Sequence, residues 1–304
     1  MTLARLLLLV AALSISGTAA FAAAQQKVFG SPEEAAQALV AAAEKGDLKQ
    51  MQAILGPGSQ ALVQSGDPVA DRRGRERFAQ VYAQAHRVEP QGDAKAVLLI
   101  GKDEWPMPIP MVKGKDGWRF DARQGREEIL NRRIGRNELS AVQAVLAYVD
   151  AQREYYLRNP QGDKLLHYAQ KFGSSKGKRD GLYYPTKPGE PPSPLGPLYA
   201  SAKAAGYTKK GADGLPSPYH GYRYRILKGQ GPRAPGGAYD YLAQGRMIGG
   251  FALLAWPATY GSSGVMTFIV NHEGVVYEKD LGRDTATVAS KITRFDPDPS
   301  WKRH

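Results

Sequence analysis

Hydrophobic positions change their spacing along this chain, and each change predicts a different kind of element. Residues 31–46 and 47–55 place apolar side chains three and four positions apart, which predicts two short helices. Residues 75–85 repeat the helical spacing, whereas residues 94–121 hold short apolar runs separated by turn residues, as β-strands do. Helices followed by short strands predict an α+β domain over residues 27–126.

The second part begins with the longest helical pattern, over residues 127–157, which ends before Pro160. Residues 173–220 are rich in Gly, Pro, Ser and Lys, which predicts a long loop region with one short helix near residues 198–205. Strand patterns return over residues 222–227, 247–256, 265–270 and 275–279, and the last two form a predicted hairpin. We therefore expect a second α+β domain over residues 127–304, with a long helix, a loop region and an antiparallel sheet.

Both element orders are similar to known folds. The first resembles nuclear-transport-factor-2-like (NTF2-like) domains, in which helices cover a curled antiparallel sheet and leave a pocket. The second resembles the globular part of type IV pilins and pseudopilins, in which a helix lies across a small antiparallel sheet. These resemblances imply a pocket in the first domain and an assembly role for the second.

The beginning of the chain has the pattern of a secretory signal peptide over residues 1–24. Arg5 precedes an apolar run over residues 6–15, and small residues lead to a cleavage site near Ala22 to Ala24. The run is shorter than the roughly 20 apolar residues that span a bilayer. We expect a periplasmic or secreted protein with no transmembrane anchor after cleavage. Because the chain has 0 Cys, disulfides, zinc thiolate sites and Cys nucleophiles are excluded.

The charge balance is basic, with a formal net charge of +12. Lys and Arg are interspersed with acids, which is typical of a solvated surface. The alternative, for an exported protein, is that this charge attracts an anionic envelope polymer. An envelope protein and an anionic envelope polymer are therefore the candidate partners. The basic balance permits nucleic-acid binding, but no motif in the sequence supports it, so nucleic acid is not the expected partner. The sequence does not specify an oligomeric state.

Several catalytic and metal motifs are incomplete. Gly261-Ser262-Ser263-Gly264 is one residue short of the G-x-S-x-G nucleophile elbow and precedes a strand, so it predicts a turn. The 5 histidines lie at no metal-ligand spacing. A calcium-type loop that starts at Asn159 has Lys where the turn needs Gly. We therefore predict no metal and no cofactor.

Eight polar or aromatic residues remain as candidates for a ligand-binding surface. They are Asp67, Asp71, Arg72, Tyr222, Arg223, Tyr239, Asp240 and Tyr241. The tyrosines and Asp240 suit a sugar or a peptide, although tyrosines at strand spacing also pack half-buried in sheets. A metal-independent hydrolase would instead need carboxylates converging in one cleft, with Asp67, Asp71, Arg72, Tyr239 and Asp240 as the available groups. Their spacing leaves both hypotheses open.

Long strings of the sequence carry a further resemblance. SGDPVADRRGRERF, GKRDGLYYP and GGFALLAWPATYGSSGVMTFIV are similar to the bacterial family DUF2950, a domain of unknown function, and the similarity covers nearly all of the chain after residue 24. The resemblance implies export to the envelope of Gram-negative bacteria and supplies no established activity, cofactor or catalytic residue. We expect a non-enzymatic binding or assembly module of the cell envelope, with an Asp/Tyr acid–base hydrolase as the alternative.

Overall fold

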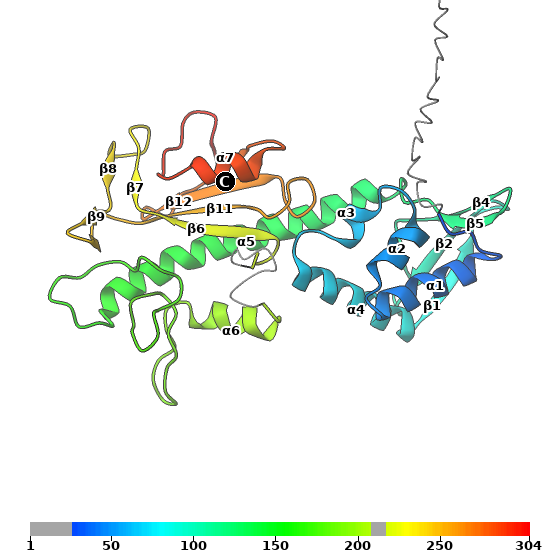
Figure 1. The fold of residues 1–304 in the computed structure, drawn as a ribbon, viewed down its shortest axis with the longest axis horizontal. Coiled ribbons are helices and arrows are strands. Elements are labelled where there is room, and N and C mark those ends of the chain that lie inside the picture. Colours follow the sequence, from blue (N-terminus) through cyan, green and yellow to red (C-terminus); the bar gives the residue numbers. More distant parts are fainter. Residues whose placement is uncertain (1–25, 208–216) are drawn as a thin grey trace, which may run out of the picture.

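The computed structural model describes residues 26–207 and 217–304, which fold around two hydrophobic cores joined by one long helix (Figure 1). The predicted signal peptide over residues 1–24 lies outside the described residues. Within the described ranges, no helix combines the length and the apolarity needed to cross a membrane. The α+β class is confirmed. We call residues 26–125 the N-terminal half and the described residues after 158 the C-terminal half.

Four helices open the N-terminal half. They are α1 (Pro32–Glu44), α2 (Leu48–Leu55), α3 (Gln60–Val63) and α4 (Pro68–Gln84). The Ser31 hydroxyl accepts the Glu34 amide at 3.1 Å, and Pro32 takes the first helical position, so α1 begins where the sequence predicts. The third predicted helix begins at Pro68 rather than near residue 75, because Asp67 caps it in the same way.

An antiparallel sheet follows these helices. Its strands are β1 (His86–Pro90), β2 (Lys95–Ile100), β3 (Trp105–Pro106), β4 (Met111–Gly114) and β5 (Gly117–Phe120), in the order β1-β2-β4-β5 with β3 also paired to β2. Buried side chains of β2 pack with those of α1 and α2. The sequence predicted a curled sheet, but this sheet is not strongly curled, because strands of two to six residues accumulate little twist.

Helix α5 (Arg126–Arg158) runs from one core to the other (Figure 1). Gly125 precedes it with a φ of 78°, and Asn159 ends it with a φ of 44°. Ile129 packs against the N-terminal core, whereas residues from Ala141 onwards belong to the C-terminal core. The predicted long helix is therefore confirmed, and its first turn joins one core while the residues from Ala141 onwards join the other.

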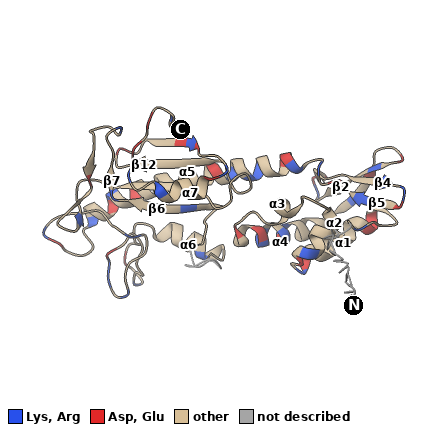
Figure 2. Cartoon of the chain, turned by 45° about the horizontal axis from the view of Figure 1, so that its top comes forward, with Lys and Arg blue, Asp and Glu red and all other residues tan. Residues whose placement is uncertain are grey.

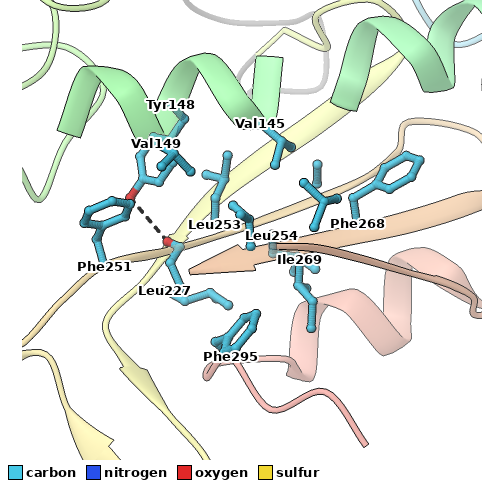
Figure 3. Close-up of a cluster of buried hydrophobic side chains, with 14 of the residues drawn as sticks. Val145, Tyr148, Val149, Leu227, Phe251, Leu253, Leu254, Phe268, Ile269 and Phe295 are labelled. Atoms are coloured by element: carbon cyan, nitrogen blue, oxygen red, sulfur yellow. Dashed lines mark hydrogen bonds between the residues drawn. The ribbon is translucent and has the colours of Figure 1, made fainter. Parts of the chain in front are cut away.

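The C-terminal sheet is also antiparallel. Its strands are β6 (Tyr222–Leu227), β11 (Ala252–Pro257), β12 (Met266–Asn271), β13 (Val276–Asp280) and β14 (Lys302–Arg303), in the order β14-β13-β12-β11-β6. Helix α5 covers one face and α7 (Thr285–Lys291) covers the other (Figure 3). Because both faces are covered, Leu253, Leu254, Phe268 and Ile269 on the central strands are almost completely buried.

The predicted loop region contains one short helix, and two pairs of short strands follow it in the chain. They are α6 (Gly196–Ala204), the pair β7 (Gly229–Gln230) and β8 (Tyr239–Asp240), and the pair β9 (Leu242–Ala243) and β10 (Arg246–Met247). The loop region is anchored by a bridge between Gly173 and Tyr183 and by stacking of Tyr183 on Tyr199, with ring centroids 4.2 Å apart. The irregular backbone between residues 173 and 199 is therefore held by packing contacts, whereas residues 208–216 of the predicted loop lie outside the described residues.

Candidate functional site

The Asp67 carboxylate lies where the two halves meet, and its hydrogen bonds to the described residues are structural. Oδ1 accepts the amides of Val69 and Ala70 at 3.1 and 3.0 Å, which caps α4. Oδ2 accepts the Tyr207 hydroxyl and the Gly221 amide, each at 2.8 Å. The side chain is 0% exposed. A buried carboxylate with four donors is a link between the halves rather than a free acid or base.

Helix α5 adds a second set of links close to Asp67. The Arg133 guanidinium donates to the carbonyls of Ala61 and Leu62 in the N-terminal half, both at 2.6 Å. The Asn137 amide donates to the Ser263 carbonyl at 2.9 Å in the C-terminal half. Glu138 accepts the amides of Val265 and Met266, each at 2.9 Å. Neighbouring turns of one helix thus bond to both halves.

Burial shifts the protonation of the groups around this junction. It raises the pKa of the Tyr207 hydroxyl, and the neighbouring Asp67 carboxylate raises it further. Burial lowers the pKa of His220, against the opposing effect of Asp67. It also lowers the pKa of Arg133, which Asp71 partly offsets. All three shifts have desolvation as their main cause, as expected for a packed junction.

Asp71 and Arg72 follow Asp67 on α4 but differ from it. Oδ2 of Asp71 accepts the Ser65 amide at 2.9 Å, and burial raises the pKa of the carboxyl against the opposing effects of Ser65 and Arg133. Arg72 is exposed and lies 3.7 Å from Glu76 in a surface ion pair. Asp71 is therefore the candidate carboxylate with a raised pKa, whereas Arg72 belongs to the solvated face of α4.

Tyr222 and Arg223 begin β6, directly after the Gly221 amide that binds Asp67. Tyr222 is 0% exposed and donates its hydroxyl to the Met266 carbonyl at 2.9 Å, and burial raises its pKa. Arg223 is half-buried and lies opposite Trp256 in the ladder with β11. Tyr222 is therefore a strand tyrosine packed in the sheet, which the sequence left open as the alternative to a ligand-binding residue.

Tyr239, Asp240 and Tyr241 lie beyond the other end of β6. Asp240 is exposed and forms an ion pair with Arg294 at 2.6 Å. Tyr241 is 0% exposed and donates its hydroxyl to the Gln230 side chain at 3.0 Å. The eight candidates thus form two groups at opposite ends of β6, and Asp240 does not share a cleft with Asp67 or Asp71.

A surface hollow that the sequence did not predict lies in the C-terminal half. It measures about 260 Å³ and is lined by Gln161, His167, Tyr168, Gln170, Lys171, Asp180 and Lys228. These residues come from the loop after α5, from the loop region and from the link between β6 and β7. The length of the loop region was the only signal for it, because its members are spread over distant segments.

In the calcium-type loop beside this hollow, the Asp163 carboxylate is bonded to other side chains of the protein. His167 Nε2 lies 2.8 Å from Oδ2 of Asp163, and Arg246 lies 3.2 Å from Oδ1. The hydrogen bond from His167, followed by the charge of Arg246, lowers the pKa of Asp163. Within the described residues, no group of three or more His, Asp or Glu side chains could hold a metal ion.

The Gly261–Gly264 turn that resembled a nucleophile elbow is structural. Ser263 is 0% exposed, accepts the Thr259 amide at 2.9 Å and donates to the Thr259 carbonyl at 3.1 Å. Ser262 is 5% exposed and lies 3.5 Å from the Ala61 carbonyl, across the junction. The predicted turn before β12 is confirmed.

Comparison with known proteins places the chain in a family. No curated protein and no solved structure is similar to it. A family model described as "Protein of unknown function (DUF2950)" matches residues 26–304, which include every described element and both groups of candidate residues. The chain therefore belongs to the DUF2950 family.

Proposed function

We propose that this protein is an exported, non-enzymatic binding module of the cell envelope, in which the hollow that Gln161, Gln170 and Lys228 help to line is the binding site. The hollow carries the proposal, because it brings together the exposed Lys228 and the side-chain amides of Gln161 and Gln170 from separate segments of the chain. Export is part of the proposal and rests on the signal-peptide pattern of residues 1–24.

The arrangement of the carboxylates supports binding over catalysis. An acid–base hydrolase needs two titratable groups that reach the same substrate. Asp67 is occupied by four structural donors, and Asp240 is paired with Arg294 at the other end of β6. Basic and acidic residues are interspersed along the ribbon of both halves (Figure 2). An anionic partner would therefore be recognised locally rather than by one large basic face.

The two fold resemblances belong to the proposal as well. We infer that the N-terminal half is an NTF2-like domain with a flattened sheet and that the C-terminal half is pilin-like, with α5 lying across its sheet. The pilin-like arrangement supports an assembly role in which an envelope protein is the partner. The element orders support both inferences.

One assay separates the binding module from the hydrolase. The mature protein is incubated with purified peptidoglycan sacculi and, separately, with alginate; retained protein and released soluble fragments are both measured, at low and moderate salt. We expect retention on at least one polymer without release of fragments. Retention that vanishes at moderate salt on both polymers would reduce the interaction to charge alone and contradict the proposal.

The hydrolase remains the second candidate because the pKa of Asp71 is raised, as general acids require. It predicts fragment release that Asp71→Asn abolishes. Asp93→Asn is the matched control, because Asp93 is an exposed carboxylate in the turn before β2. Release that depends on Asp71 and not on Asp93 would replace the binding module with the hydrolase.

A further inference from the structure

The kind of ligand that the hollow can bind depends on the side chains whose hydrogen-bonding groups are not already used within the protein. His167 is engaged at both ring nitrogens, by Asp163 at 2.8 Å and by the Tyr168 carbonyl at 3.1 Å. Lys171 donates to Asp180 and to Ser175, each at 2.8 Å. These residues form the wall of the hollow, and their main hydrogen-bonding capacity is used within the protein.

Lys228 differs from the other cations of the hollow. It is exposed, and within residues 26–207 and 217–304 it has no ion pair and no side-chain hydrogen bond. Because Lys171 is paired with Asp180, Lys228 supplies the uncompensated positive charge of the hollow. One positive charge matches a carboxylate, whereas a phosphate group carries about two negative charges near neutral pH.

Two glutamines add oriented hydrogen-bonding groups beside this lysine. The Gln161 amide donates to the Tyr155 hydroxyl at 3.0 Å, and the Gln170 amide donates to the Gly245 carbonyl at 2.8 Å. Each bond fixes the amide and leaves its carbonyl oxygen and a second N–H available. Groups that both donate and accept are suited to hydroxyls, which also do both.

The volume of the hollow and an aromatic ring in its lining restrict the size and the chemical class of the ligand further. The hollow, at about 260 Å³, is smaller than the roughly 300–1,000 Å³ of pockets for drug-sized ligands. Its Tyr168 ring is held by stacking on Tyr156, with centroids 4.9 Å apart, and by edge contact with Phe251 at 4.8 Å. A fixed aromatic ring suits the apolar face of one sugar-sized ring.

We propose that the hollow binds a single acidic sugar unit, with the carboxylate of the sugar at Lys228 and its hydroxyls at Gln161 and Gln170. The inference rests on the proposed binding function and names the chemical class of its ligand. An acidic sugar at the end of, or within, an envelope polysaccharide would present these groups together.

The test uses the mature protein and three probes: D-glucuronate, D-glucose and inorganic phosphate, titrated by NMR chemical shift. We expect saturable glucuronate binding in the millimolar range, with glucose and phosphate each at least about tenfold weaker. Glucose lacks the carboxylate, and phosphate lacks the sugar ring and its hydroxyls. Absence of saturable glucuronate binding, or phosphate binding as tight as glucuronate binding, would overturn the proposal.

Lys228→Met tests the assigned contact, with Lys291→Met as the matched control on the exposed surface of α7. We expect the first substitution to weaken glucuronate binding about tenfold and leave glucose binding unchanged, because a charge-assisted hydrogen bond is lost. The control should bind as the unsubstituted protein does. Equal glucuronate affinity for both variants would contradict the assignment. If glucuronate fails to bind while peptidoglycan or alginate still retains the protein, the acidic-sugar assignment is wrong and the binding function stands.

Discussion

Asp180 shows how one carboxylate organises part of an irregular loop. Its Oδ1 accepts the Ser175 amide at 2.7 Å, and its Oδ2 accepts the Ser175 hydroxyl at 2.9 Å and the Lys171 ammonium at 2.8 Å. These bonds favour the ionised form, so the pKa of Asp180 falls from 3.8 to about 2, with the Lys171 bond as the largest cause. The carboxylate thereby fixes the wall of the hollow.

The lowered pKa makes a prediction about acid stability. A carboxyl with a lowered native pKa contributes stability above its unfolded value of 3.8, and this contribution is lost as the pH falls through about 2. We expect Asp180→Asn to lower the free energy of unfolding at neutral pH, and the difference from the unsubstituted protein to shrink between these two pH values. Urea unfolding at a series of pH values measures it. A constant difference down to the lower value would contradict the lowered pKa.

Asp67 shows which part of a site's chemistry a sequence can indicate. The Asp67-Pro68 pair is a helix-start signal of the same kind as Ser31-Pro32, so its capping role was accessible. Its other partners, Tyr207 and Gly221, are 140 and 154 residues away in the chain. Local spacing carries no information on such contacts, which is why the candidate was identified without its role as a link.

Elements with strong local signals were predicted well, and elements that depend on tertiary contacts were not. Helix α5 matches its prediction to within a residue at each end. Strand β1 was missed because most of its side chains are exposed and it ends at Pro90, so it shows no apolar alternation. The strand predicted over residues 247–256 begins only at Ala252, because Gly249 and Gly250 prevent an earlier start. Gly250 has a φ of 144°, which regular strand residues do not adopt.

The beginning of α5 depends on one glycine, and a second glycine in the same helix is a natural control. Gly125 has a φ of 78°, and a Cβ there would lie 2.0 Å from the Pro108 carbonyl oxygen. Gly135 lies inside the helix, and a Cβ added there would meet nothing within 4 Å. We expect Gly125→Ala to cost at least about 2 kcal/mol of unfolding free energy and Gly135→Ala to add about 0.5–1 kcal/mol.

Chemical denaturation of the two alanine variants measures both changes on one helix. Opposite signs are expected because alanine favours helical φ values and is strained at positive ones. If Gly125→Ala were as stable as the unsubstituted protein, the start of α5 would not need the left-handed conformation. The orientation of α5 relative to the N-terminal half would then depend on other contacts.

At the scale of the whole molecule, the two cores unfold together only if the junction transmits stability between them. Asp67 is the most buried of the charged links, with two bonds into α4 and two into the C-terminal half. Asp47 is a matched residue, because it caps α2 through the Gln50 amide at 2.9 Å and is exposed. The two aspartates thus share the capping role and differ in the link.

We expect Asp67→Ala to lower the free energy of unfolding by about 3 kcal/mol or more, since it removes a cap and leaves buried donors without an acceptor. Asp47→Ala should cost about 1 kcal/mol, the ordinary value of a cap. Calorimetry should show one transition for the unsubstituted protein and for Asp47→Ala, and two for Asp67→Ala, because the halves then unfold separately. Equal costs and a single transition in both variants would mean that the halves are coupled without Asp67, by other links such as those that Arg133, Asn137 and Glu138 make from α5.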